Sequence, residues 1–396
     1  MKKILLILLL LFPISVYSLD YPEVLSKKVE IYDLKEKKIY YEIASHERAS
    51  IASLTKIATT LTAIESISNL EEQVTITSSI LNTVPWDASV AGLKVGDVLT
   101  YRDLLYASML PSGADATNSL AIHSSGSIEN FVEKMNELAS NIGLTNTHFV
   151  NVMGYDDANH YSTVDDVRKL LEYALENPLF REIYTTKEYR LSNGLLVKST
   201  LYKYRTDSSS LEKILGSKTG YTKDAGYCLS ALSNINGHEM IFIVLNAPVK
   251  NNRYYNIIDT TTYIDFMKEH YKEEILVYKD TLIKKIPTTL SSIETYELYA
   301  DKDILKYLPS DYEKSLLKIE YEGLEKLSFR NKKGSKIGTI HYSYGEEDLY
   351  QQDVILEKKI DLSIQKVLET YYLWIIGFLF LLFLIHLILF KKRKNK

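Results

Sequence analysis

Hydrophobic and polar residues alternate in two short segments near the start of the chain and then change to a helical spacing. Residues 29–32 and 39–43 flank a turn rich in lysine and glutamate, which is typical of a β-hairpin. From Ile57 to Ile67 the apolar residues recur every three or four positions, as on the buried face of a helix. We therefore expect Ser53 and Lys56 to lie on the first turn of this helix.

Further helical segments follow. Thr163 followed by Asp166 has the spacing of a capping box, which favours a helix from there through Leu171. Three other segments have the length or periodicity of helices, and Pro111 separates the first two: residues 103–110, 115–123 and 128–138.

After Gly220 the pattern becomes that of strands. Residues 227–233 and 239–245 are separated by Asn236-Gly237, a strong signal for a tight hairpin turn. Helical spacing returns over residues 257–271. The order of these elements predicts an α/β domain over residues 20–272, in which helices flank an antiparallel sheet.

From residue 273 to Ile364 the chain is charged and strand-like, with turns at Lys333-Gly334 and Gly345. We interpret this part as a small β-rich spacer domain. Residues 371–390 then carry no formal charge apart from a titratable His386, and twenty such residues span a bilayer as a helix. The basic tail 391–396 predicts a cytoplasmic end, with the body of the chain on the extracytoplasmic side of the cell membrane.

The first eighteen residues combine a basic start, an apolar run and small residues before Leu19. This pattern predicts a signal peptide over residues 1–18; an uncleaved anchor is the alternative, which the short run and Pro13 disfavour.

Composition narrows the function. The chain has 396 residues and a net charge of −4, which gives no reason to expect nucleic acid as a partner. Its one cysteine, Cys228, excludes an intramolecular disulfide and is expected to be a buried, inert thiol. The eight histidines show no H-E-x-x-H or similar spacing, so no metal site and no cofactor is predicted.

Residues 51–60, IASLTKIATT, place Lys56 three positions after Ser53 in an otherwise apolar run. A lysine is costly to bury unless its charge is used or neutralised. The pair is either a surface lysine near a serine or a nucleophile with its base.

Two later segments favour chemistry. The stretch 111–116, PSGADA, lies at the break between two predicted helices. The stretch 216–222, GSKTGYT, contains a Lys-Thr-Gly triplet. Ser-x-x-Lys, a serine-led loop and Lys-Thr-Gly, in that order, form the signature of penicillin-binding proteins and serine β-lactamases.

The residues in and around these motifs resemble those of one family more closely. ASLTK, LPSGADA, residues 151–163 and SKTGYTKDAGYCL look like the low-molecular-mass, serine-type D-alanyl-D-alanine carboxypeptidases. The resemblance covers about residues 24–271 and implies a penicillin-binding protein fold, with a catalytic domain, a small β domain and a C-terminal anchor. It also implies removal of the terminal D-alanine from peptidoglycan stem peptides, in cell-wall maturation, and inhibition by β-lactams.

The resemblance implies a catalytic role for Ser53, Lys56 and Ser112 and a substrate-binding role for Lys218. Ser53 would form the acyl-enzyme, and Lys56 would be its base if burial and positive charge lower the pKa of its amine. Ser112 would relay a proton to the departing D-alanine. Lys218 would supply that positive charge and attract the terminal carboxylate of the substrate.

Four further residues are implied in binding. Thr219 would hydrogen-bond the carboxylate, and the backbone N–H groups of Ser53 and Tyr221 would form the oxyanion hole. Gly220 would let the backbone approach the ligand closely. Arg253 is either a residue of the cleft or an ordinary surface arginine.

One position departs from the family pattern, because Ala114 stands where an asparagine is usual. Restoring it, Ala114→Asn, is expected to speed acylation if only a hydrogen bond was lost, and to slow it if the pocket was reshaped around alanine. A membrane-anchored β-lactamase or a catalytically weak scaffolding protein are the alternatives to the carboxypeptidase. His160 and His148 are expected to be structural.

Overall fold

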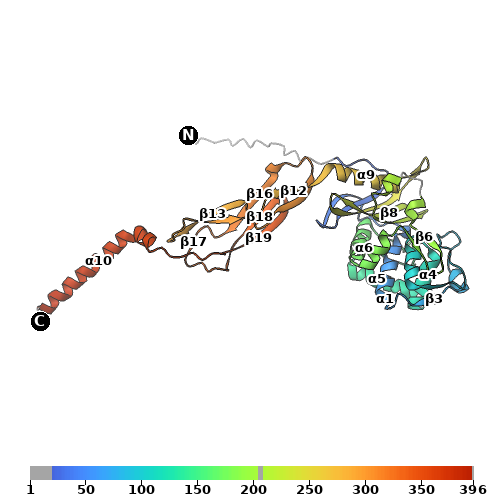
Figure 1. The fold of residues 1–396 in the computed structure, drawn as a ribbon, viewed down its shortest axis with the longest axis horizontal. Helices are drawn as coiled ribbons and strands as arrows, with labels where there is room; N and C mark the ends of the chain where they lie inside the picture. Colours follow the sequence, from blue (N-terminus) through green and yellow to red (C-terminus); the bar gives the residue numbers. More distant parts are fainter. Residues whose placement is uncertain (1–19, 204–207, 395–396) are drawn as a thin grey trace, which may run out of the picture. The chain divides into compact units, whose positions relative to one another are not determined.

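The structure is a computed structural model that describes residues 20–203 and 208–394. The chain divides after His270 into an N-terminal unit and a C-terminal unit that begins at Tyr271 (Figure 1). The predicted signal peptide, residues 1–18, lies outside the described residues.

A five-stranded antiparallel sheet forms the centre of the N-terminal unit, as the sequence predicted. Its order is β2-β1-β9-β8-β7, with strands β1 (Lys28–Asp33), β2 (Lys38–Ile43), β7 (Gly216–Thr222), β8 (Gly226–Ile235) and β9 (His238–Ala247). The Asn236-Gly237 turn joins β8 to β9, and both residues have positive φ, as a tight hairpin requires. The Lys-Thr-Gly motif lies within the edge strand β7, so strand structure begins at Gly216, before the point at Gly220 where the sequence predicted it.

Helices cover both faces of the sheet. Helix α9 (Tyr255–His270) packs on β8 and β9, and α6 (Val164–Glu176) packs on β1 and β9 from the other face (Figure 1). Helix α1 (Lys56–Ser66) is buried from Lys56 to Ala63, because its neighbours surround it. These neighbours include α3 (Tyr101–Met109), α4 (Ala114–Ser125), α5 (Ile128–Ile142) and α7 (Pro178–Thr185).

Short elements complete this unit. They are η1 (Ala52–Thr55), β3 (Gln73–Thr75), α2 (Ser78–Leu81), β4 (Val98–Thr100), β5 (Glu188–Arg190), β6 (Leu196–Lys198), η2 (Thr200–Lys203), α8 (Ser208–Leu211), β10 (Val249–Lys250) and β11 (Arg253–Tyr254).

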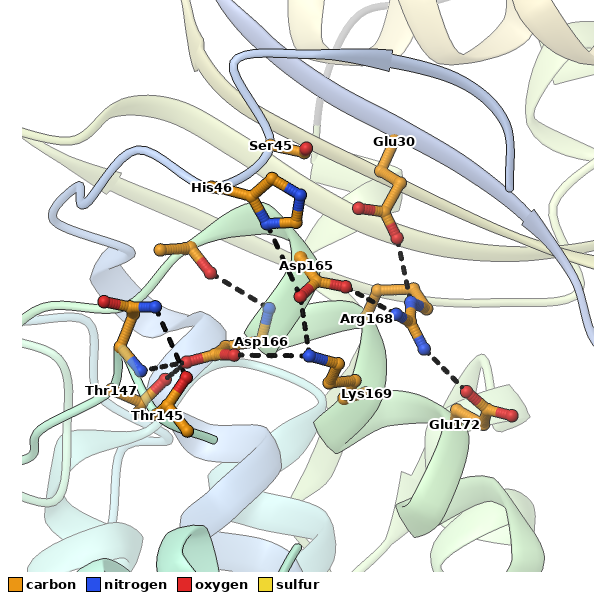
Figure 2. Close-up of polar contacts among 12 residues, drawn as sticks. Glu30, Ser45, His46, Thr145, Thr147, Asp165, Asp166, Arg168, Lys169 and Glu172 are labelled. Carbon is orange, nitrogen blue, oxygen red and sulfur yellow. Dashed lines mark hydrogen bonds and ion pairs between the residues drawn. The ribbon is translucent and has the colours of Figure 1, made fainter. Parts of the chain in front are cut away.

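The predicted capping box at the start of α6 is only half formed. Thr163 Oγ1 accepts from the Asp166 N–H at 3.1 Å, as expected. The Asp166 carboxylate instead accepts from Asn146 N and Thr147 Oγ1, both at 2.8 Å (Figure 2). The carboxylate therefore ties a neighbouring loop to the helix and leaves the cap one-sided.

A buried ion network joins α6 to the sheet (Figure 2). The Arg168 guanidinium donates to Glu30 at 2.8 Å, to Asp165 at 2.5 Å and to Glu172 at 2.8 Å. Its cationic centre also lies 4.4 Å from the Tyr32 ring centroid. Because Glu30 and Tyr32 belong to β1, these contacts hold the helix on this strand.

The C-terminal unit contains the predicted β domain. It consists of β12 (Tyr271–Val277) paired with β15 (Ile304–Pro309), of β14 (Thr295–Tyr299), β13 (Leu282–Thr289) and β17 (Leu327–Ser328), and of β16 (Leu317–Gly323), β18 (Lys336–Tyr344) and β19 (Glu347–Ile355). Its own apolar core includes Ile286, Leu298, Ile340 and Leu356. This domain therefore has an apolar core of its own, separate from the core of the N-terminal unit.

The chain ends in the apolar helix α10 (Ile364–Lys394), which is long and apolar enough to cross a membrane. It begins at Ile364, before the predicted start at Tyr371. Gln365, Lys366 and Glu369 favour helix although they are polar, so the helix starts ahead of the apolar segment.

Candidate active site

Ser53 and Lys56 lie side by side at the start of α1. Ser53 is on the 3-10 turn η1 rather than on α1 itself, and Lys56 is the first residue of α1. The Lys56 Nζ is 3.2 Å from the Ser53 Oγ. Lys56 is 2% exposed whereas Ser53 is half-buried, so the hydroxyl is accessible and the amine is shielded from water.

The environment of Lys56 favours its neutral form. Burial lowers the pKa of the Lys56 amine from 10.5 to about 7, against the opposing charge of Asp115. Its Nζ also donates to the Met153 carbonyl at 2.8 Å, which holds the amine beside Ser53. Near neutral pH a substantial fraction of Lys56 can therefore accept a proton.

Lys218 is the second buried lysine of this region. It lies on β7, is 1% exposed, and donates to the Thr219 carbonyl at 2.7 Å. Burial, followed by the charges of Lys56 and Lys203, holds the pKa of Lys218 well below its usual range. Burial is also the main cause of the low Lys56 pKa, a role that the sequence interpretation divided between burial and Lys218.

Strand β7 runs against the turn that carries Ser53. A Cβ added to Gly220 would lie 3.0 Å from both Ser53 N and the Ala52 Cβ, so only glycine allows this approach without displacement. Tyr221 follows and is 56% exposed. Since β7 is an edge strand of the sheet, an extended peptide can pair along it next to Ser53.

Ser112 occupies the break between α3 and α4. Its backbone is left-handed, with φ of +64°, and its side chain is buried. Among the described residues, its Oγ has no hydrogen-bond partner. A strained backbone and an unsatisfied buried hydroxyl are typical of a group held ready for a ligand.

Ala114, which stands where the family usually has an asparagine, is enclosed by its neighbours. Ala114 is 1% exposed, and its N–H donates to the Ser89 carbonyl at 2.7 Å. Asn118, one turn further along α4, donates to Thr83 Oγ1 at 2.8 Å and so does not replace the lost amide. Asp115 binds the same covering loop, at the N–H groups of residues 91–93.

The loop 151–155 positions Lys56, which the sequence interpretation missed. Asn151 Oδ1 accepts from the N–H groups of Met153, Gly154 and Tyr155, and this turn presents the Met153 carbonyl to Lys56. A Cβ on Gly154 would lie 1.9 Å from the Ala52 carbonyl oxygen. The Asn-x-x-Gly spacing was a visible signal, but its contact with η1 was not.

Two further residues, Asp156 and Thr200, join distant parts of the site and were also missed. Asp156 accepts from Ser50 Oγ at 2.8 Å and from Thr222 Oγ1 at 2.6 Å, linking the approach to η1 with the end of β7. Thr200 lies 2.5 Å from Thr219, oxygen to oxygen, and its N–H donates to the Leu110 carbonyl. No local pattern in the sequence signals such pairs.

The histidine and cysteine predictions are confirmed. His160 Nδ1 accepts from Val150 N at 3.2 Å, and Nε2 lies 2.8 Å from Thr55 Oγ1. Burial lowers the pKa of His160 to about 4, so the ring is neutral and structural. His148 lies at the surface and contacts the Asn159 carbonyl. Cys228 is buried, and burial raises the pKa of its thiol to about 12.

Arg253 lies on the separate ribbon β10–β11 with an exposed side chain, and its role stays a prediction. Within residues 20–203 and 208–394, no group of three or more His, Cys, Asp or Glu side chains is arranged to hold a metal ion.

Comparison with known proteins agrees with the motifs. Residues 16–249, more than half of the chain, match the family profile described as D-alanyl-D-alanine carboxypeptidase. Residues 271–362 match the profile of the C-terminal domain of penicillin-binding protein 5.

Individual relatives cover long stretches. The D-alanyl-D-alanine carboxypeptidase DacF of Bacillus subtilis strain 168 is 27% identical over 319 residues, 80% of each chain. The D-alanyl-D-alanine carboxypeptidase of Streptomyces sp. strain K15 is 36% identical over 218 residues, 52% of this chain and 75% of that protein. The crystal structure of penicillin-binding protein 5 from Haemophilus influenzae shares the fold, with a TM-score of 0.63 and 24% identity over 87% of this chain and 99% of that one. The resemblance and the predicted fold are confirmed: the chain belongs to the D-alanyl-D-alanine carboxypeptidase family.

Proposed function

We propose that Ser53 is the nucleophile with which this serine-type D-alanyl-D-alanine carboxypeptidase acts on its substrate. The observation that carries this assignment is the 3.2 Å contact between Ser53 Oγ and a buried Lys56 amine whose pKa is about 7. A serine hydroxyl needs such a base before it can attack a carbonyl carbon. The neutral Lys56 takes the Ser53 proton as the Oγ–carbon bond forms.

The oxyanion that develops on the substrate carbonyl is then stabilised by backbone N–H groups of Ser53 and Tyr221, which the close approach at Gly220 brings together. As the peptide bond breaks, the terminal D-alanine leaves with a proton that Lys56 returns through the Ser112 hydroxyl. The buried, unpartnered Ser112 Oγ is suited to this relay. Water hydrolyses the Ser53 ester and regenerates the hydroxyl.

Lys218 and Thr219 bind the terminal carboxylate of the substrate in this proposal. The resting enzyme disfavours a charge on Lys218, because its amine is buried and close to another lysine. An arriving carboxylate reverses this balance, since an opposite charge favours the ammonium form. Substrate binding is therefore accompanied by proton uptake. Tyr221 and Arg253 are assigned to the outer part of the same site, and the peptide lies along β7.

The substrates are peptidoglycan stem peptides that end in D-Ala-D-Ala, and β-lactams acylate the same serine. We place α10 in the cell membrane and the catalytic unit on its extracytoplasmic side, because the basic residues follow the apolar segment. Deleting the chain from Tyr371 should release a soluble protein that keeps full peptidase activity.

The direct test measures D-alanine release from a D-Ala-D-Ala peptide beside acylation by penicillin and its decay. A carboxypeptidase releases D-alanine and holds penicillin for a long time. Rapid decay of the penicillin adduct would indicate a β-lactamase, and acylation without D-alanine release would indicate a catalytically weak scaffold. The acylation rate should rise with pH around a midpoint near 7, because only neutral Lys56 accepts the proton.

A further inference from the structure

A cavity of about 510 Å³ lies in the C-terminal unit where α10 begins. Three segments line it: the end of β13 with its connection to β14 (residues 288–291, 293 and 294), the end of β17 with the turn after it (residues 328–330) and the face of α10 that carries Lys366, Thr370 and Tyr371. It shares no residue with the site around Ser53, and the peptidase reaction does not use it.

The helix that lines the cavity is fastened to the β domain. The Ser363 N–H donates to the Leu290 carbonyl at 2.7 Å, and Leu362 forms an antiparallel bridge with Ser291. The Lys366 N–H in turn donates to Ser363 Oγ at 3.3 Å. Backbone contacts therefore hold the start of α10 against the connection between β13 and β14, so these two walls of the cavity are attached to each other.

The position of the cavity along α10 corresponds to the surface of a bilayer. The uncharged segment begins at Tyr371, which is the innermost lining residue, and Lys366 lies five residues before it. At about 1.5 Å per residue, Lys366 lies roughly 7 Å outside the hydrocarbon. The polar headgroup layer is about 5–8 Å thick on each side. This placement rests on the proposed membrane anchoring of α10.

The charges of the lining suit an anion. Arg330 and Lys366 contribute two positive charges against one carboxylate, Glu294. The exposed Arg330 guanidinium has no carboxylate partner in the described chain, and Lys366 has only a loose ion pair with Glu369 at 3.5 Å. An arginine fork binds phosphate oxygens in pairs, and hydroxyl groups such as those of Ser328 and Thr370 add donors.

Apolar side chains share the lining. Ile293 and Phe329 are 42% and 40% exposed, and Leu290 lies beside them. Apolar groups next to one cation without a carboxylate partner and one loosely paired cation match a molecule that carries phosphate at one end and hydrocarbon at the other. Basic pockets between transmembrane helices bind anionic lipid headgroups by the same pairing of cations with phosphate.

We propose that this cavity binds the headgroup of an anionic phospholipid, with Arg330 and Lys366 on its phosphodiester. Ile293 and Phe329 contact the glycerol and the upper part of the acyl chains. A single bound lipid holds the β domain against the membrane surface where α10 enters the bilayer.

The test uses the full chain in a mild detergent, supplied with equal amounts of phosphatidylglycerol and phosphatidylcholine. Retained lipid is quantified by mass spectrometry, and affinity is measured by titration. We expect about one phosphatidylglycerol per chain, bound in preference to phosphatidylcholine. Each of Arg330→Gln and Lys366→Gln should weaken phosphatidylglycerol binding about fivefold.

The matched control is Lys332→Gln with Lys333→Gln, two exposed lysines on the next turn along the chain that do not line the cavity. This pair changes the net charge as much as Arg330→Gln with Lys366→Gln does, and it should leave the preference unchanged. Equal loss in the two double variants would reduce the effect to general surface charge and overturn the proposal. Equal retention of the two lipids by the unmodified chain would overturn it as well.

D-alanine release and penicillin labelling are measured on the same samples. All variants should keep both, because the cavity is separate from Ser53. Failure of the chain to insert into bilayers would overturn the lipid site while D-alanine release still stands, so the two proposals fail independently.

Discussion

The N-terminal unit buries cationic side chains in two places and treats them in opposite ways. In the network of Figure 2, Arg168 contacts the carboxylates of Glu30, Asp165 and Glu172. At the active site, Lys56 and Lys218 are buried as deeply, but neither forms an ion pair within the described chain. The nearby Asp115 carboxylate is occupied by backbone N–H groups.

The difference shows what a buried cation can be used for. An arginine cannot lose its proton under ordinary conditions, so it must be paired, and pairing makes it structural. A lysine without a partner loses its charge instead, and its pKa moves towards the pH at which it works. The same desolvation therefore produces a structural ion network in one place and, in the proposed function, a general base in the other.

The largest expected effect is a loss of activity at the site around Ser53 that leaves the Arg168 ion network intact. Ser53→Ala should abolish D-alanine release and labelling by a fluorescent penicillin, because the proposed reaction forms its acyl bond on the Ser53 hydroxyl. The thermal unfolding midpoint should hardly change, since the hydroxyl is half-exposed and the ion network is untouched. Labelling that persists on another serine would contradict the assignment.

The second prediction concerns stability at the site. Lys56→Met keeps the volume but removes the amine, so acylation should fall by about a thousandfold or more. A pKa lowered to about 7 means that burying Lys56 costs stability, and this cost is present below about pH 7 and vanishes only above about pH 10.5. At pH 7 the variant should therefore be more stable by about 1–2 kcal/mol.

Denaturant titration of Lys56→Met and the parent chain at pH 7 measures this difference. Ser53→Ala serves as the inactive control without a charge change. A large loss of stability in Lys56→Met would show that the hydrogen bond to Met153 outweighs desolvation.

Replacing the buried cation of the ion network by methionine should have the opposite effect on the free energy of unfolding. Arg168→Met leaves Glu30 buried without its cation, which should destabilise the protein by about 3–5 kcal/mol. Activity per folded molecule should persist at low temperature. An unchanged or raised unfolding midpoint would remove the distinction between the two clusters.

A smaller effect should appear in the pH dependence of the network. Burial raises the pKa of Glu30 from 4.5 to about 6, even though Arg168 opposes this shift. The folded state therefore favours the protonated acid, and this stabilisation is complete below about pH 4.5 and lost as the pH rises through 6. The shift corresponds to about 2 kcal/mol.

Glu30→Gln should remove this component, so the stability difference between variant and parent should change between pH 4.5 and 7. Urea unfolding at a series of pH values measures it. A difference that stays constant over this range would mean that Glu30 keeps its charge throughout.

The smallest effect is expected at Ala114. Its burial, and its backbone contact with Ser89, leave little room for a larger side chain. We therefore now expect Ala114→Asn to lower the acylation rate, by about fivefold for each 1 kcal/mol of crowding, on both peptide and penicillin. Faster acylation on both would show that the site can still accommodate the asparagine of the family.

Local patterns in the sequence predicted much of the fold. The hairpin at Asn236-Gly237, the helical spacing after Ile57 and the apolar segment 371–390 each depend on neighbouring residues, and the structure has the corresponding elements. The order of the three motifs was sufficient to identify the family. Local rules failed where residues farther along the chain competed. Asn146 and Thr147 donate to the Asp166 carboxylate, which therefore does not complete the capping box of α6.

The sequence by itself determined the chemical groups of the site: a serine, a lysine three residues later, a second serine and a second lysine. Only the tertiary structure decided what those groups can do. It gave Arg168 a carboxylate partner, Glu30, from strand β1, withheld a carboxylate partner from Lys56, and joined Asp156 to Ser50 and Thr222. The physical reason is that desolvation and ion pairing depend on what surrounds a side chain in space, and residues far along the chain supply those surroundings.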